Sequence, residues 1–374
     1  MRKYLLFFLI NIFLICCLPL KQHAQDSIPP DTHYAVNLFP FFQQQSESNP
    51  LFATEEILEF RLTVDYEKLL KDRGLEREYH KATLTYKDTA GSEVAIELKV
   101  MARGSHRRDP SICRFPPIML NFSRKTAQSN VFGHANKLKL VTHCLGDDYV
   151  LREYLAYKVY NIITGESFRV RLCRVEYVDV NGKRKTERKY AFLIEDDNEM
   201  ARRNKGTIVP KEKWVGMEST DTRAMARVAF FQYMIGNTDW SVSYRHNIKL
   251  ISRDSLKAPT PVPYDFDYSG IVAPPYAVPP PELGITSVRQ RLFRGYPYSD
   301  EIYSEVIRAF NKHKAEVYKL YLNCEPLDNN YRRQALGFFD NFYETVNDQK
   351  DFNTKIVRVA QQNRKSYVVV KGLK

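Results

Sequence analysis

The 374-residue sequence lacks several patterns that identify common classes of protein. It contains six cysteines, but no Cys-x-x-Cys pair and no cysteine–histidine spacing typical of a zinc site. No block of basic residues alternates with aromatic residues, which argues against a nucleic-acid partner. There is no internal repeat, and beyond the N-terminus no apolar run approaches the length of a membrane span. We therefore expect neither a zinc protein, nor a repeat array, nor an integral membrane protein.

The N-terminus has the composition of a secretory signal peptide. A short basic start precedes an apolar run over residues 4–18, and a polar stretch follows. We predict that residues 1–25 are removed and that the protein is exported, to the periplasm, the cell surface or the medium. A lipoprotein that uses Cys16 or Cys17 is the alternative, but the bulky Ile15 stands where a small residue is expected.

Basic residues outnumber acidic ones. The formal net charge is +12, and it falls to +9 without the signal peptide, because that segment holds three basic residues and no acid. This surplus favours acidic partners such as phosphates, anionic glycans or lipid headgroups. A scattered basic surface that only serves solubility is the alternative.

Four cysteines remain in the mature chain: Cys113, Cys144, Cys173 and Cys324. In an oxidising compartment they can form one or two disulfides, and four cysteines allow three full pairings. Cys113 and Cys144 flank a compact segment, so their pairing is our first choice.

The order of predicted elements indicates an α+β protein of two lobes. Residues 26–55 are rich in proline, glutamine, serine and asparagine, and we predict a flexible lead-in there. Residues 56–198 are predicted as a β-rich, mostly antiparallel lobe with one helix, and residues 199–374 as a mainly helical lobe. A ligand is expected in the cleft between the lobes.

Alternation and turn residues predict the strands. Phe60, Leu62 and Val64 recur at every second position and favour a strand over 57–66. Polar turn residues at 87–92 predict a hairpin between the strands on either side. The remaining strands are predicted over 81–86, 94–101, 118–122, 137–142, 168–178, 189–194 and 367–370.

Helical spacing and end signals predict the helices. Apolar residues at helical spacing indicate a helix over 148–163. Asp221 can cap a second helix that runs to Ile235, and Gly236 stops it. Two amphipathic helices are predicted after a proline-rich segment, over 299–321 and 329–347.

Two short polar clusters occur between Gly236 and residue 270. The first contains Asp239 and Asn247, and in the second Asp265 and Asp267 bracket a phenylalanine. Carboxylate and amide oxygens are hard ligands, which hold Mg²⁺ or Mn²⁺ against phosphate oxygens. The two clusters, with Asn247, Asp265 and Asp267 among their oxygen donors, are therefore candidates for such a metal site.

These clusters, and the order of elements over roughly residues 95–270, resemble the protein-kinase-like superfamily. More particularly, the chain resembles an exported bacterial member of the CotH-type atypical kinases. The resemblance implies a two-lobed kinase-like fold that binds ATP, or another nucleoside triphosphate, with Mg²⁺ or Mn²⁺. It also implies that Asp239 is the catalytic-loop aspartate, Asn247 the metal-binding asparagine and Asp265 the metal aspartate.

The resemblance implies further roles in the N-terminal lobe. Lys139, on a strand, would grip the nucleotide phosphates and pair with Glu153 on the following helix. Arg103, in the sequence Arg-Gly-Ser, matches the loop element of CotH-type proteins that covers the phosphates. Glu195 would lie at the hinge between the lobes.

Each of these residues also has an ordinary structural interpretation. Lys139 alternates with Lys137 on an exposed strand, and Glu153 could pair only with a neighbouring basic side chain. Asp239 could shape a turn after the helix. His246 is interpreted as a structural hydrogen-bonding residue rather than a base.

The sequence departs from the kinase pattern in two respects. Asp239 and Asn247 are eight positions apart, where the usual catalytic loop has about five, and a glycine-rich loop is missing. Both departures bear on activity more than on fold.

The predicted function is a metal-dependent phosphotransferase, a monomer, that acts on an exported protein or on an envelope or extracellular glycan. The alternative is a non-catalytic envelope binding protein that kept the fold and lost the chemistry. A third is a glycosyltransferase in which Asp265, Phe266 and Asp267 form an Asp-X-Asp metal motif. It ranks last because the motif follows antiparallel strands and a helix.

Overall fold

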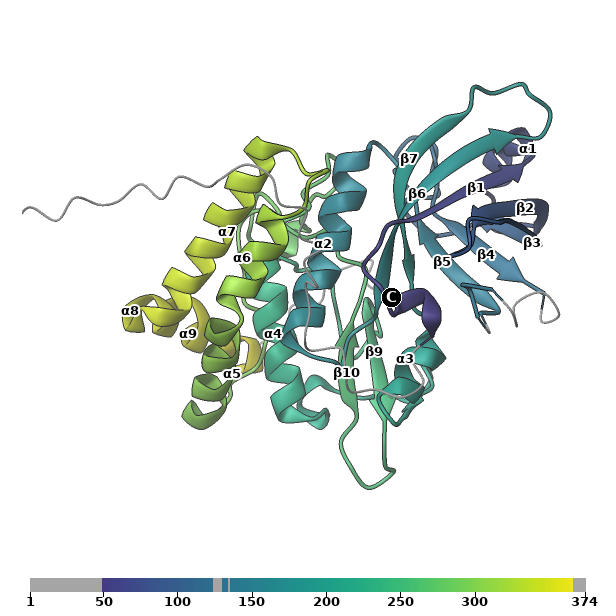
Figure 1. Cartoon of the computed structure of the whole chain (residues 1–374). Coiled ribbons are helices and arrows are strands. Elements are labelled where there is room, and N and C mark those ends of the chain that lie inside the picture. The colour runs from purple at the N-terminus through teal and green to yellow at the C-terminus, as the bar shows by residue number, and fades with distance from the viewer. Residues whose placement is uncertain (1–48, 124–129, 134, 366–374) are drawn as a thin grey trace, which may run out of the picture. The chain divides into compact units, whose positions relative to one another are not determined.

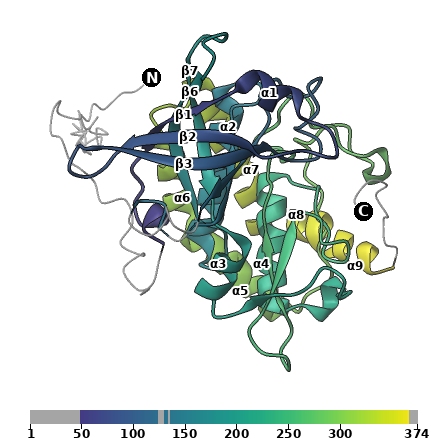
Figure 2. The same ribbon diagram turned by 90° about the vertical axis from the view of Figure 1, so that its right-hand side faces the viewer.

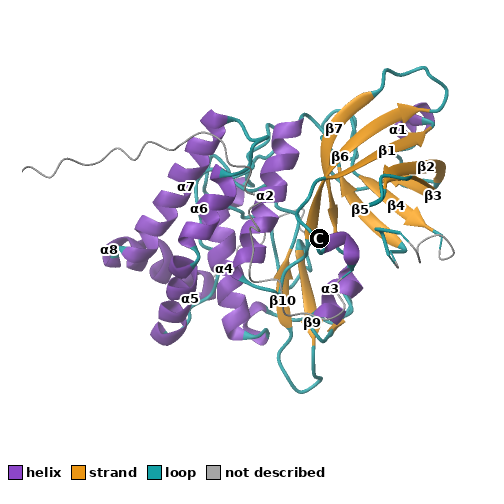
Figure 3. Ribbon diagram, viewed as in Figure 1, coloured by secondary structure: helices purple, strands orange, loops and turns teal. Residues whose placement is uncertain are grey.

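The structure, a computed structural model, describes residues 49–123, 130–133 and 135–365 (Figure 1). The predicted signal peptide, most of the lead-in and the strand at 367–370 lie outside these residues. The described part is a mixed α+β structure, with a β-barrel beside a set of helices (Figure 3). Among the described helices, none combines the length and the apolar character needed to span a membrane.

The strands of the N-terminal part close into a barrel in the order β1-β2-β3-β4-β5-β7-β6. Their bounds are β1 (Leu58–Val64), β2 (His80–Lys87), β3 (Glu93–Ala102), β4 (Ile118–Phe122), β5 (Lys137–Val141), β6 (Val170–Asp179) and β7 (Glu187–Ile194). Neighbours pair antiparallel, as predicted, except that β1 and β6 pair in parallel. Figure 2 shows β1, β2 and β3 side by side. We predicted a mostly antiparallel sheet but not its closure, because the closing partners lie 115 residues apart, as in Arg61 and Glu176.

The barrel interior is built from alternating side chains. Phe60, Leu62 and Val64 of β1 are all buried in it, which confirms the predicted face. The predicted hairpin is also confirmed, since β2 pairs with β3 along the whole length of β2. Leu51 and Phe52, which we assigned to the lead-in, are buried in the same core. The barrel core therefore begins before the predicted boundary at residue 56.

Helix α2 (Asp147–Ile163) packs against β7 and against a helix of the C-terminal part, α6. Leu151, Leu155 and Val159 are buried, as their spacing predicted. They belong to a second hydrophobic core, which includes residues of β6 and β7 and most of the C-terminal helices. The acidic Glu153 on the same helix is buried as well, so it requires a partner.

The C-terminal part contains strands as well as helices. It contains a small antiparallel sheet of β8 (Thr207–Ile208), β9 (Ile248–Ser252) and β10 (Thr260–Pro263), in the order β10-β9-β8. Strands β9 and β10 lie between the two polar clusters, so their pairing brings the end of the first cluster next to the start of the second.

Helix α4 (Thr222–Ile235) has the predicted ends. The side chain of Asp221 accepts a hydrogen bond from the backbone N–H of Ala224, and Gly236 adopts the left-handed conformation at the C-terminus, with φ 68°. The predicted helix over 299–321 is two helices that meet at His313. The other helices are α1 (Tyr66–Lys71), α3 (Asp197–Arg203), α5 (Asp300–Lys312), α6 (Lys314–Leu322), α7 (Asn329–Asn347), α8 (Gln349–Phe352) and α9 (Arg358–Lys365).

Candidate functional site

The segment after α4 brings Asp239 and Asn247 together. The Nδ2 group of Asn247 donates to Asp239 Oδ2 at 3.0 Å and to the Asp239 backbone carbonyl at 2.7 Å. His246 Nε2 lies 3.0 Å from the other carboxylate oxygen of Asp239. The backbone N–H of Asp239 donates to the side chain of Asn237 at 3.0 Å. Asp239 is thus held in one orientation by residues on both sides of it in the sequence.

A small closed loop accounts for the eight-residue spacing. Ser241 and His246 exchange two backbone hydrogen bonds, of 2.9 and 3.0 Å, so the residues between them bulge out. Arg245 and Asn247 both adopt positive φ, 52° and 53°, where the chain turns back. The extra residues therefore leave the side chains of Asp239 and Asn247 in contact with each other, as a shorter loop would.

The β9–β10 hairpin brings Asp265 to the same place. Asn247 directly precedes β9, Tyr264 directly follows β10, and the Tyr264 backbone N–H donates to the Asn247 carbonyl at 3.0 Å. Asp265 comes next, with φ 62°, a conformation that aspartate tolerates better than most residues. Its own N–H donates to the hydroxyl of Tyr157 at 2.8 Å, and its side chain stays 39% exposed.

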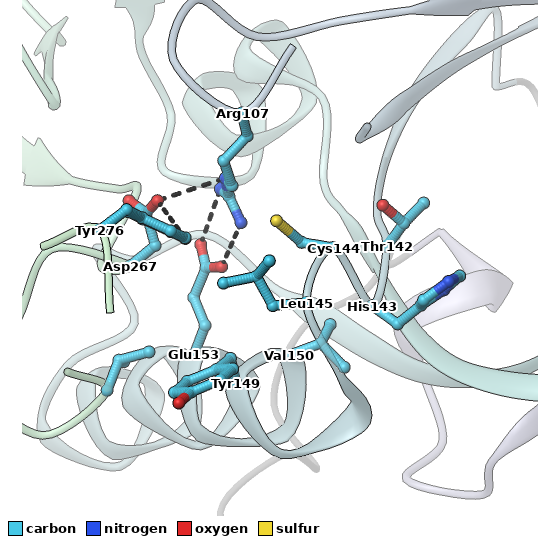
Figure 4. Close-up of a pocket in the computed structure, with 11 residues that line it drawn as sticks. Arg107, Thr142, His143, Cys144, Leu145, Tyr149, Val150, Glu153, Asp267 and Tyr276 are labelled. Carbon is cyan, nitrogen blue, oxygen red and sulfur yellow. Dashed lines mark hydrogen bonds and ion pairs between the residues drawn. The ribbon is translucent and has the colours of Figure 1, made fainter. Parts of the chain in front are cut away.

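Arg107 is the residue that the sequence analysis missed. Its guanidinium group contacts three carboxylates, those of Glu153 at 2.8 Å, Asp265 at 3.0 Å and Asp267 at 3.2 Å. Figure 4 shows the guanidinium group between Glu153 and Asp267. Tyr276 also donates to Asp267, at 3.0 Å. We call these four charged residues, Arg107, Glu153, Asp265 and Asp267, the Arg107 cluster.

Burial dominates the electrostatics of the Arg107 cluster. It raises the pKa of Asp267 well above the ordinary value, although Arg107 opposes the rise. Burial also raises the pKa of Glu153, again against the pull of Arg107. Burial disfavours the charged form of Arg107 itself, but the carboxylates around it hold its pKa well above the usual range. The charges of Arg107, Glu153 and Asp267 are therefore buried and mutually dependent, whereas Asp265 is partly exposed.

Asp265 and Asn247 can hold a divalent cation only together with other oxygen donors. Arg107 contacts one carboxylate oxygen of Asp265, and Asn247 uses its Nδ2 group for Asp239, which leaves its amide oxygen to coordinate. In the described part of the chain, no group of three or more His, Cys, Asp or Glu is placed to bind a metal ion. This donor set fits Mg²⁺, which keeps waters and takes phosphate oxygens beside one or two protein ligands. Asp267, the third predicted ligand, is buried, and its Oδ2 atom contacts both Arg107 at 3.2 Å and Tyr276 at 3.0 Å.

The predicted ion pair between Lys139 and Glu153 is not formed, because Glu153 pairs with Arg107 instead. Lys139 Nζ lies 2.6 Å from Asp197, and Lys249 Nζ lies 2.8 Å from the other oxygen of the same carboxylate. Burial raises the pKa of Asp197, but the two lysines outweigh it and lower the pKa below its usual range. Burial lowers the pKa of Lys139.

Both lysines lie near the aromatic ring of Tyr264, with Nζ 5.6 Å (Lys139) and 5.5 Å (Lys249) from the ring centroid. Because Tyr264 directly precedes Asp265, the positive charge of Lys139 lies beside the loop that carries Asp265. The strand lysine is thus close to the predicted metal ligands, although its carboxylate partner is Asp197.

Arg103 and Glu195, which were both predicted to bind the nucleotide, differ in burial and in their contacts. Arg103 is half-buried, and burial lowers its pKa, while the charge of Asp265 acts on that pKa in the opposite direction. Glu195 is buried and accepts from Arg203 Nε at 2.9 Å and Nη2 at 2.8 Å, and from the backbone N–H of Arg169 at 3.0 Å. The carboxylate of Glu195 therefore holds α3 to the barrel.

The sequence carried only a weak signal for Arg107. It lies in the basic loop Arg103-Gly104-Ser105-His106-Arg107, four positions after the arginine that we chose. Its partners lie 46 and 158 positions away in Glu153 and Asp265. The structure shows that Glu153 is buried and needs a cation, but the sequence did not identify which one.

No family model matches the chain, and no curated protein sequence matches it. Among solved structures, a proinflammatory kinase of Helicobacter pylori, CtkA, is similar with a TM-score of 0.34 and 10% sequence identity. The match covers 77% of this chain and 92% of that one. A similarity of this size carries no argument about function, and the resemblance to CotH-type kinases stays a prediction.

Proposed function

We propose that this protein is a metal-dependent phosphotransferase with a kinase-like site. The observation that carries the proposal is the meeting of Asp239, Asn247 and Asp265 at one end of the β9–β10 hairpin. Phosphoryl transfer needs positioning and charge neutralisation more than covalent chemistry. A carboxylate for the acceptor, an amide and a carboxylate for a metal, and nearby cations supply those needs.

The residues divide the work as follows. The Asp239 carboxylate, held by Asn247 and His246, orients an acceptor hydroxyl and takes its proton. The hydroxyl oxygen forms a bond to the terminal phosphorus of a nucleoside triphosphate, the bond from that phosphorus to its bridging oxygen breaks, and the diphosphate leaves. Arg103 and Lys139 offer positive charge to the phosphates. Asn247 and Asp265 would hold Mg²⁺ or Mn²⁺, which neutralises charge on the phosphate oxygens when bound.

The proposed setting follows from the predicted signal peptide. An exported protein or an envelope or extracellular glycan would be the phosphate acceptor, in the periplasm, at the cell surface or in the medium. ATP or another nucleoside triphosphate would be the donor. The protein would act as a monomer.

The second candidate, a non-catalytic binding protein, is favoured by a specific observation. Glu153 and Lys139 are each engaged by other partners, Arg107 and Asp197, rather than by each other. The glycosyltransferase has no such support. Asp267 of the Asp-X-Asp motif is held by Arg107 and Tyr276, and the described strands do not form a doubly wound parallel sheet.

An Asp265→Asn variant tests the proposal. Asparagine tolerates the positive φ of this position, so the backbone can keep its conformation while one metal-binding charge is lost. Losing even an outer partner of a metal ligand costs roughly 10–100-fold in metal affinity, and we expect at least that loss in Mg²⁺-dependent ATP binding. Isothermal titration calorimetry with and without Mg²⁺ measures it.

Asp254→Asn is the matched control, since Asp254 is exposed in the β9–β10 connection and its charge is not near the site. Equal Mg²⁺-dependent ATP binding by wild type and Asp265→Asn would show the assignment to be wrong. Binding without transfer of labelled phosphate to any envelope protein or glycan would favour the second candidate.

A further inference from the structure

A cavity of about 430 Å³ opens beside the loop that follows Asp239. Its lining includes Trp240 and Tyr244 from that loop, and Trp214 from the segment between β8 and α4. The volume lies in the range of small-molecule sites, roughly 300–1,000 Å³. None of the lining residues belongs to the Arg107 cluster, so this is a separate site next to the proposed catalytic aspartate.

Both tryptophans of the chain line this one cavity. Trp240 is buried, and its indole N–H donates to the Asn237 carbonyl at 3.2 Å, so its ring is fixed next to Asp239. Trp214 is 73% exposed, although Gly216 lies against its indole ring. A Cβ added at Gly216 would lie 3.2 Å from that ring. Tyr244 is 42% exposed. Large aromatic side chains rarely stay this exposed without a binding role when they gather at one cavity.

The cavity also has polar groups on its walls. Ser241 and Ser243 carry hydroxyl groups, and Asn363 offers its amide oxygen, since its Nδ2 group already donates to the Phe293 and Gly295 carbonyls. The charged lining residues are Glu218 and Arg294, of opposite sign. The guanidinium group of Arg294 donates to the backbone carbonyls of Thr238 and Trp240. With opposite charges in balance, the lining selects for neither an anion nor a cation.

We propose that this cavity binds a neutral sugar ring, so that the phosphate acceptor is a glycan; this inference rests on the proposed phosphotransferase function. A pyranose has an apolar C–H face, which suits an indole or phenol ring, and a rim of hydroxyl groups, which suits serine and amide groups. An apolar peptide side chain would match the rings but would make no hydrogen bond with the serine hydroxyl groups or with the Asn363 amide oxygen.

The position of the cavity accounts for the chemistry. Trp240, one of its lining residues, directly follows Asp239 in the sequence, although Asp239 itself is not part of the lining. In the proposed complex, a sugar in the cavity would extend a hydroxyl group past Trp240 toward the Asp239 carboxylate, whose oxygens already accept from His246 and Asn247. The transferred phosphoryl group would become an ester on that hydroxyl oxygen, with the nucleoside diphosphate as the leaving group.

Binding of neutral oligosaccharides, without nucleotide, tests the inference. The full chain is titrated with chitohexaose, maltohexaose and xylohexaose, and the tryptophan emission reports on the cavity directly because both indoles line it. We expect at least one of the three to change the emission and to bind in calorimetry. We also expect Trp214→Ala to weaken that binding about tenfold or more, the order of effect seen when a stacking aromatic is removed.

Leu75→Ala is the matched control, because Leu75 is 89% exposed and does not line the cavity. It should bind as wild type does, and Trp214→Ala should fold normally since the indole is mostly in solvent. No binding of the three sugars, or equal binding by Trp214→Ala and wild type, would overturn the inference. So would Trp214-dependent binding of a serine- and threonine-containing peptide mixture in place of the sugars.

Sugar binding that occurs only after residues 366–374 are removed would also overturn the inference, because the occupant of the cavity would then be the end of the chain itself. Because these titrations contain no nucleotide, their failure leaves the phosphotransferase proposal standing. Failure of the Asp265→Asn test would in turn leave sugar binding unaffected.

Discussion

At the scale of single residues, Arg107 is the central counter-ion of the candidate site. One guanidinium group contacts three carboxylates that come from a helix and from the loop after β10. A buried ionic group of this kind adds little net stability compared with an apolar core, but each charge depends on the others. Removing Arg107 leaves the carboxylates of Glu153 and Asp267 buried without their cation.

We therefore expect Arg107→Met to lower the free energy of unfolding by about 3–5 kcal/mol, the usual cost of breaking a buried ion pair. Methionine keeps much of the side-chain volume, so the loss reports charge rather than packing. Urea denaturation followed by circular dichroism measures it.

Arg61→Met provides the comparison. Arg61 pairs with Glu176 at 2.7 Å, but both side chains are exposed, so we expect a change within about 1 kcal/mol. Similar losses in the two variants would mean that Arg107 does not serve as the central counter-ion.

At the scale of elements, the site depends on how α4 ends. Gly236 adopts φ 68° at the C-terminus of the helix, and its carbonyl accepts from the N–H of Gly270, which follows the second polar cluster. An added Cβ at Gly236 would lie 3.0 Å from the ring of Phe338 and 3.2 Å from the Val288 carbonyl. The position therefore requires glycine both for its conformation and for its space.

A pair of alanine substitutions separates these two requirements. Gly236→Ala and Gly284→Ala share a positive φ, 68° and 66°, but an added Cβ at Gly284 meets nothing within 4 Å. Both should lose about 1–2 kcal/mol for the left-handed conformation. Gly236→Ala should lose about 1–3 kcal/mol more because of crowding.

Chemical denaturation of the two variants measures the difference. Equal losses would show that Phe338 and Val288 move aside without cost and that the close approach at Gly236 is not required.

At the scale of the whole molecule, one disulfide links the loop of Arg107 to the helix of Glu153. Cys113 and Cys144, our first choice of pairing, are joined across 31 residues. Cys173 and Cys324 are free thiols. Cys113 follows the loop that carries Arg107 and Cys144 precedes α2, so the covalent link restrains both sides of the Arg107–Glu153 pair.

We expect a Cys113→Ala/Cys144→Ala variant to lose about 3–4 kcal/mol of stability, as loop-closure entropy predicts for a closed segment of this length. Reductant should destabilise wild type to a similar extent and should leave the double variant unchanged. Thermal unfolding with and without reductant measures both effects.

Cys324→Ala is the control and should remain sensitive to reductant. A reductant effect of equal size in the double variant would place the sensitivity elsewhere in the chain.

The sequence alone determined the features that depend on near neighbours in the chain. Alternation placed Phe60, Leu62 and Val64 on the inner face of β1, and Asp221 and Gly236 marked both ends of α4. Backbone conformation and capping involve residues a few positions apart, so a linear pattern is enough to predict them. The polar residues around Asp239 and Asp265 were also recognised from their chemistry.

Only the tertiary structure decided which distant groups meet. It closed the barrel through the parallel pair of β1 and β6, gave Glu153 to Arg107 rather than to Lys139, and gathered both tryptophans at one cavity. These contacts join positions as far apart as 158 residues, and no local pattern distinguishes one buried cation or one aromatic ring from another at such distances. The choice among them follows from which side chains the packed core leaves within reach of each other.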